Sequence, residues 1–155
     1  MISRRSRLLI CTVLLIPMLL CACGQEAELP RWSFVVEGAG IEVFSSFDYA
    51  KLDKVSITVE KPQDGDVSEE LRGVYLKDVL DYLSVSDYAS ITLTARGGSS
   101  IEYAPEIIED PATILVFEVN GRTKWKNGIE IVQVVAGNQP EDMWLWNLKT
   151  LTVNP

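Results

Sequence analysis

Histidine and cysteine, two of the side chains that often carry out catalysis or bind metals, are absent or rare in this sequence. None of its 155 residues is a histidine, and its three cysteines stand at positions 11, 21 and 23. After Cys23, this excludes zinc sites built from cysteine and histidine, Ser-His and Cys-His nucleophile pairs, haem held by histidine, and disulfides. Any catalysis would have to depend on carboxylates, lysine, tyrosine or a bound cofactor.

A group of acidic side chains lies in the polar segment at residues 61–70, which contains Asp64, Asp66, Glu69 and Glu70. Carboxylate oxygens are ligands for calcium, but their spacing lacks the regular alternation of an EF-hand loop, and no ligand set is complete. We interpret the segment as a solvated turn and keep calcium as the alternative.

The thiol of Cys23 stands out because of the residues that precede it. Arginines at positions 4, 5 and 7 are followed by an apolar run over residues 8–20. A membrane-spanning helix needs about 20 apolar residues, so this run is too short for a comfortable permanent span. The pattern therefore predicts an export signal.

The end of this segment, Leu20-Cys21-Ala22-Cys23, resembles the lipobox of bacterial lipoproteins. The resemblance implies that the thiol of Cys23 receives a diacylglycerol and that the signal is cut just before it. Cys21 fits less well, because bulky Leu20 would occupy the place of a small residue. Several acyl chains hold a protein firmly, so we expect a lipid-anchored, extracytoplasmic protein of the cell membrane. The alternatives are an ordinary signal peptide and an uncleaved anchor.

The basic start bears on the export route. Residues 3–8 partly resemble the twin-arginine signal, which exports folded and often cofactor-loaded proteins, but Arg7 stands where that signal has an aromatic residue. A general secretory signal with extra arginines is the other interpretation.

Removal of residues 1–22 leaves a strongly acidic chain. It would keep 11 basic and all 22 acidic residues, a net charge of about −11 by counting. This balance argues against nucleic acid as a partner and against electrostatic adhesion to anionic lipid. We expect a signal peptide over 1–22, the lipidated cysteine and a polar tether over 23–31, and one domain over 32–155.

The elements that must position any site are mostly strands. β-branched and alternating patterns predict strands at residues 32–37, 55–59, 90–95, 113–119, 129–135 and 148–153. Residues 47–52 form a short segment typical of one helical turn. Asn120-Gly121 predicts a type I′ hairpin that pairs residues 115–119 with 122–126. The clearest helix covers 73–83, where Leu76, Val79, Leu80 and Leu83 form one apolar stripe, while Lys77, Asp78 and Asp81 face water. The sum is an α+β domain, mostly β, with one main amphipathic helix.

The order of these elements resembles the molybdopterin-binding domain of the sulfite oxidase family. The resemblance rests on the helix motif at residues 73–80, the strand that ends at Ala95 before a glycine-rich turn, the hairpin segment 115–121, and the closing segment 144–153. It covers residues 35–153 and implies a mixed sheet of the sulfite oxidase type. The family's enzymes bind molybdenum through a cysteine just after the strand that matches residues 55–59.

The departures from this family argue against its redox chemistry. Val59 stands where the metal-binding cysteine is expected, and residues 128–137 lack the usual arginine. The turn at 95–98 has neither its acid nor its aromatic residue, and Trp146 replaces a lysine in the closing motif. Little is left to neutralise a cofactor's phosphate or tune its metal, so we expect no cofactor and keep molybdopterin as the alternative.

Two functions follow. The first is a non-catalytic module that binds a small planar ligand or an envelope protein partner through the place where the family keeps its pocket. Its candidate residues are Arg96, Gly97, Gly98, Tyr103, Asn138, Trp144 and Trp146. Two tryptophans could stack a planar ligand; alternatively, they simply pack on the core. The second is a molybdopterin-dependent oxidoreductase with atypical cofactor ligation.

Overall fold

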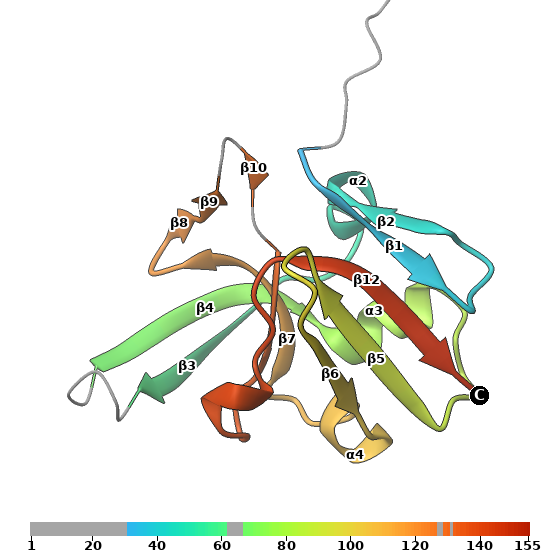
Figure 1. The fold of residues 1–155 in the computed structure, drawn as a ribbon. Helices are drawn as coiled ribbons and strands as arrows, with labels where there is room; N and C mark the ends of the chain where they lie inside the picture. Colours follow the sequence, from blue (N-terminus) through green and yellow to red (C-terminus); the bar gives the residue numbers. More distant parts are fainter. Residues whose placement is uncertain (1–30, 62–66, 127–128, 131) are drawn as a thin grey trace, which may run out of the picture.

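The computed structural model describes residues 31–61, 67–126, 129–130 and 132–155, and these form a mostly β domain with few, short helices (Figure 1). The strands are β1 (Ser33–Glu37), β2 (Val43–Ser45), β3 (Val55–Lys61), β4 (Val67–Tyr75), β5 (Ser90–Ala95), β6 (Ser100–Tyr103), β7 (Thr113–Val119), β8 (Arg122–Thr123), β9 (Trp125–Lys126), β10 (Ile129–Glu130), β11 (Gln133–Ala136) and β12 (Leu148–Asn154). The helices are α2 (Ser46–Tyr49), α3 (Leu76–Tyr82), α4 (Pro105–Ile108) and the 3₁₀-helix η3 (Glu141–Met143).

Two sheets make up the body of the domain. One has the order β2-β1-β12-β5-β6, and the other has the order β11-β7-β4-β3 with β8 paired to β7. The pairing of β1 with β12 is parallel and the other strand pairs are antiparallel, so the first sheet is mixed. The sequence-based prediction of a β-rich α+β domain with a mixed sheet is confirmed at this level.

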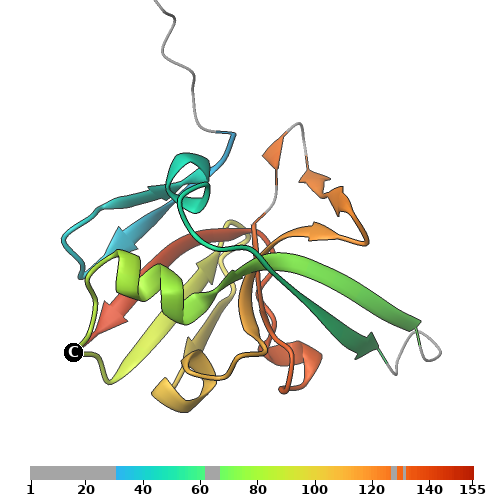
Figure 2. The same cartoon turned by 180° about the vertical axis from the view of Figure 1, so that it is seen from behind.

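The main core lies between the two sheets and α3. Strands of both sheets and the helix contribute to it, among them Phe34, Leu80, Leu93, Leu115 and Leu151. Figure 1 looks onto the first sheet with α3 behind it, and Figure 2, from the opposite side, shows α3 in front. A second, smaller cluster packs on the other face of β7. Because both faces of this strand are buried, its sequence is a nearly continuous apolar run.

The amphipathic helix is confirmed, but it is shorter than predicted. The side chains of Leu76, Val79, Leu80 and Leu83 are all buried, as the stripe requires. However, residues 73–75 belong to β4, which was not predicted. A Cβ added to Gly73 would lie 2.0 Å from the Leu115 carbonyl oxygen, so glycine here permits the close approach of β4 to β7.

The predicted hairpin is confirmed at its turn and wrong in its length. Asn120 and Gly121 have φ angles of 51° and 71°, as a type I′ turn requires. β8 pairs with β7 through two residues only, because the next strand, β9, pairs with β10 instead. The predicted strand at 129–135 is likewise two strands, β10 and β11, in different sheets.

Other short elements were also missed. β2, β6 and α4 lack a long pattern, and residues 67–70 of the predicted loop pair with β3 as part of β4. The helical turn expected at 47–52 is found as α2, one residue earlier. Within the described ranges, no helix has both the length and the apolar character needed to cross a membrane. Cys23, the whole segment 1–30, Asp64 and Asp66 lie outside the described residues.

Candidate functional site

The glycine-rich turn places three predicted site residues on the surface. Arg96, Gly97 and Gly98 connect β5 to β6 and are exposed. The backbone N–H of Arg96 donates to the Asn147 carbonyl at 2.9 Å, and its guanidinium donates to the Ser33 carbonyl at 3.1 Å. The turn therefore lies beside residue 147, directly after Trp146 in the chain.

The two tryptophans lie in different environments. Trp144 is 6% exposed within the second apolar cluster, and its indole N–H donates to the Ala136 carbonyl at 2.9 Å. Trp146 is 43% exposed, and the ammonium of Lys124 lies 5.6 Å from its ring centroid. Trp144 is thus a core residue, and Trp146 alone offers an accessible ring face.

Tyr103 and Asn138 also have structural contacts. Tyr103 lies at the end of β6 away from the turn, is buried, and donates its hydroxyl to the Met143 carbonyl. Burial raises the pKa of this hydroxyl above its ordinary value. The exposed amide of Asn138 donates to both carboxylate oxygens of Asp110 at 3.0 Å. The structure therefore groups Arg96, Gly97 and Gly98 near the Trp146–Asn147 segment, whereas Tyr103 and Trp144 are buried in the core.

The position that the family resemblance assigns to a metal ligand is closed. Val59 is 4% exposed and belongs to the same apolar cluster as Leu71, Ile114 and Trp144. A Cβ added to Gly137 would lie 3.3 Å from the Cγ1 of Val59, so the backbone of Gly137 leaves little space beside this side chain. An aliphatic side chain in such a cluster has no electron pair and no open side to offer a metal, so the residues present do not fit a metal centre here.

Among the described residues, no group of three or more histidine, cysteine, aspartate or glutamate side chains could hold a metal ion. Of the predicted calcium candidates, Glu69 and Glu70 lie on β4.

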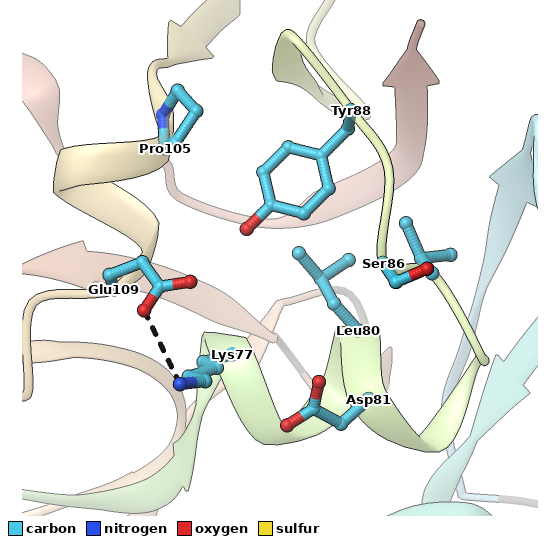
Figure 3. Close-up of a pocket in the computed structure, with 8 residues that line it drawn as sticks. Lys77, Leu80, Asp81, Ser86, Tyr88, Pro105 and Glu109 are labelled. Carbon is cyan, nitrogen blue, oxygen red and sulfur yellow. Dashed lines mark hydrogen bonds and ion pairs between the residues drawn. The ribbon is translucent and has the colours of Figure 1, made fainter.

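An open groove lies at α3 and α4 (Figure 3). Its volume is about 270 Å³, and it is lined by Lys77, Leu80, Asp81, Val85, Ser86, Tyr88, Pro105 and Glu109. None of the seven site residues predicted from the sequence lines it. Lys77 and Asp81 are correctly predicted to lie on the polar side of the helix, but that side forms one wall of the groove.

The floor of the groove is built by the end of α3. The Val85 N–H donates to the Leu80 carbonyl at 2.9 Å, and the Ser84 N–H donates to the Asp81 carbonyl at 3.0 Å. Ser84 has a φ of 59°, so this is a Schellman cap with serine in the left-handed position. The cap fixes Leu80 and Val85, which are both buried core residues and groove residues.

Polar groups surround this floor. Figure 3 shows Tyr88, Glu109 and Lys77 around one end, with Asp81 and Ser86 on the side of α3 and its following loop. The Lys77 ammonium and the Glu109 carboxylate are 3.3 Å apart. The loop that carries Tyr88 is fixed by the Ala89 N–H, which donates to the last strand at 2.8 Å.

The pKa shifts of Lys77 and Tyr88 argue against either residue as a proton acceptor. The hydrogen bond to Glu109 raises the pKa of Lys77 above its ordinary value of 10.5. Burial raises the pKa of the Tyr88 hydroxyl above 10.0, and the carboxylates of Glu109 and Asp81 raise it further. Near neutral pH, Lys77 is therefore charged and Tyr88 protonated, so neither is a general base. The groove can hold a ligand by charge, hydrogen bonds and apolar contact.

Comparisons with known proteins address the fold. No protein-family model matches the chain, and no curated protein sequence does. Among solved structures, the crystal structure of the sulfane dehydrogenase SoxCD from Paracoccus pantotrophus matches with a TM-score of 0.66. The two share a fold. Their sequence identity is 16%, and the match covers 82% of this chain but 39% of the SoxCD chain.

The likeness to SoxCD supports a distant sulfite-oxidase-like fold for the described domain. At 16% identity it shows the fold alone. Because the chain spans well under half of the SoxCD chain, the activity named for SoxCD belongs to a much longer protein.

Proposed function

We propose that this chain is a lipid-anchored protein on the extracytoplasmic side of the cell membrane, whose domain is a binding module without redox catalysis. The domain uses a fold of the molybdopterin-binding type of the sulfite oxidase family, and the ligand or partner approaches its exposed surface. The anchor is the thiol of Cys23, as the lipobox resemblance implies.

One observation carries the non-catalytic part of this proposal. Val59, at the place of the family's metal-binding cysteine, packs in a closed apolar cluster with Trp144, and the Gly137 backbone leaves little space beside it. The chain has no other cysteine after Cys23 to replace the missing thiolate. If Cys23 carries the lipid, the processed chain therefore has no free thiol that could bind a metal.

The exposed surface supports a binding role. The turn at Arg96, Gly97 and Gly98 lies beside the Trp146–Asn147 segment, and the groove at α3 and α4 combines apolar and charged groups. Two such surfaces on one small domain suit recognition of an envelope protein or a small ligand.

Elemental analysis separates this proposal from its alternative, a molybdopterin-dependent oxidoreductase with atypical ligation. The full-length protein is purified from the membranes of its native host, and its metal content is measured per chain. We expect molybdenum and tungsten far below one atom per chain. A stoichiometric content of either metal would overturn the non-catalytic proposal.

The anchor has its own test. Cells that produce the chain are fed an alkyne-labelled fatty acid, and incorporation and membrane association are compared for Cys23→Ala and Cys21→Ala. We expect Cys23→Ala to abolish labelling and release the protein from the membrane, and Cys21→Ala to retain both. Loss of labelling in Cys21→Ala but not in Cys23→Ala would assign the lipid to Cys21. Absence of labelling in the unsubstituted chain would reject the lipid anchor.

A further inference from the structure

We propose that the groove at α3 and α4 receives a lysine or arginine side chain that projects from a partner protein. This inference rests on the proposed function as a binding module, and it names the chemistry of the partner.

The size of the groove suits one long side chain. Its volume of about 270 Å³ is near the lower limit of the usual range of about 300–1,000 Å³ for small-molecule pockets. It is also open to solvent, so an occupant can enter while attached to a larger body. Pro105, with the small exposed parts of Leu80 and Val85, supplies apolar surface against which the methylene stem of lysine or arginine can lie.

The polar groups of the groove suit a cation at the tip of that stem. In the part of the chain that the structure describes, Asp81 has no hydrogen-bond or ion-pair partner for its carboxylate, and Glu109 has Lys77 alone. The Tyr88 hydroxyl points toward the Glu109 side of the groove, and Asp81 lies on the other side of Leu80 (Figure 3). An ammonium or guanidinium would gain ion pairs and a contact with an aromatic ring.

The groove's surroundings strengthen its preference for a cation. Asp78, Asp87 and Glu106 lie beside the lining residues in the chain, and Lys77 is the one basic residue among the lining residues. Lys77 already contacts Glu109, so an incoming cation competes with it. The excess of acidic over basic residues in the whole chain also attracts a basic partner from a distance.

The groove is formed before any partner arrives. The Schellman cap fixes Leu80 and Val85, and Pro105 begins α4 at the position where its fixed φ is best tolerated. Little ordering is then required on binding, which favours recognition by few contacts.

The test uses the full-length chain, extracted in non-ionic detergent and labelled with ¹³C in the methyl groups of leucine and valine. Four capped pentapeptides are titrated, with glycine at every position except the centre, which is lysine, arginine, norleucine or glutamate. We expect the methyl signals of Leu80 and Val85 to shift and saturate with the lysine and arginine peptides and to stay unchanged with the other two.

Variants locate the binding. Asp81→Asn and Glu109→Gln should each weaken binding of the lysine peptide about two- to fivefold, the range of an exposed ion pair. Lys77→Gln should tighten it, because Glu109 is released. Asp142→Asn removes the same charge from an exposed residue of η3 that does not line the groove, and it should leave binding unchanged.

Four results would overturn the inference. Equal shifts with norleucine or glutamate would show that the groove does not select a cation. An equal effect of Asp142→Asn and Asp81→Asn would show attraction by overall charge, with no specific site. Saturation by free ethylammonium as tight as that by the lysine peptide would assign the groove to a small amine. Metal content distinguishes failure of this inference from failure of the proposed function. A protein that contains no metal and does not bind the peptides would reject the role of the groove and leave the proposed function standing.

Discussion

Trp144 and Trp146 are two apart in the sequence but have different structural roles. Trp144 donates to the Ala136 carbonyl inside an apolar cluster, whereas Trp146 presents a ring near Lys124. Replacement of Trp144 by phenylalanine would remove one of the two hydrogen bonds to the Ala136 carbonyl, which also accepts from the Gln139 N–H at 2.9 Å, and would create a cavity.

We therefore expect Trp144→Phe to lower the free energy of unfolding by about 2–4 kcal/mol. Trp146→Phe is the matched control and should cost less than about 1 kcal/mol, because its ring is 43% exposed. Urea denaturation followed by circular dichroism measures both. Similar losses for the two variants would contradict the assignment of Trp144 to the core.

Asp48 gives the domain a defined response to acid. Burial raises the pKa of its carboxyl, but hydrogen bonds from Ser45, Tyr82 and Lys51 outweigh burial and lower the pKa from 3.8 to about 2. The Ser45 hydroxyl donates at 2.7 Å, the Tyr82 hydroxyl at 2.8 Å and the Lys51 ammonium at 3.1 Å. These bonds tie α2 to α3.

Because the folded pKa lies below the unfolded one, the stabilisation is complete above about pH 4–5 and is lost as pH falls through about 2. We expect Asp48→Asn to cost roughly 1 kcal/mol at pH 7 and to flatten the loss of stability between pH 5 and 2. Urea denaturation at a series of pH values measures this. An unchanged slope in Asp48→Asn would exclude the role of this carboxyl.

At the scale of elements, Gly73 decides how β4 meets β7. An added Cβ would lie 2.0 Å from the Leu115 carbonyl oxygen and 2.8 Å from its carbon, both backbone atoms that cannot move alone. We expect Gly73→Ala to destabilise the domain by more than about 3 kcal/mol, or to prevent its folding. Thermal unfolding followed by circular dichroism measures this.

Gly40→Ala is the control for this substitution. An added Cβ at Gly40 would meet nothing within 4 Å, and its φ is not positive, so alanine should be tolerated with a change below about 0.5 kcal/mol. A tolerated Gly73→Ala would mean that β4 and β7 are not as close as the structure places them.

Gly73 also shows how far the sequence could predict the elements. Strands such as β5 and β7 were predicted residue for residue, because their β-branched runs are long and end at turn residues. Residues 73–75 were assigned to the helix, because local pattern does not show a backbone contact with a strand 40 residues away in sequence. β2 and β6 are too short to carry a period, and their pairing alone defines them.

The candidate site was less predictable than the fold. Family resemblance selected residues by their place in motifs, and this located the turn at Arg96 but assigned the buried Tyr103 and Trp144 to a binding surface. The groove was missed because its lining comes from a helix face, a cap and a second short helix that only the tertiary structure brings together. Serine in place of glycine at position 84 hid the cap from sequence inspection.

At the scale of the whole molecule, the chain enters the domain beside α2, and α4, one wall of the groove, lies at the opposite end. In both views, α2 and the start of β1 are at the top and α4 is at the bottom (Figures 1 and 2). Residues 23–31 would span at most about 30 Å when extended. If Cys23 carries the lipid, we expect α4, one wall of the groove, to lie on the side of the domain away from the bilayer and to be accessible to partners.

This arrangement predicts how fast cysteines introduced at different places on the surface react with a thiol reagent when the protein is in a membrane. After cleavage before a lipidated Cys23, the chain has no other thiol, so an introduced cysteine is labelled alone. We expect Ser86→Cys, at the groove, to react with a polyethylene glycol maleimide equally fast in nanodiscs and in detergent. Arg31→Cys, at the entry of the chain, should react more slowly in nanodiscs because the bilayer shields it. Protection of Ser86→Cys in nanodiscs would mean that the groove faces the membrane, and a basic side chain of an envelope protein could then not reach it.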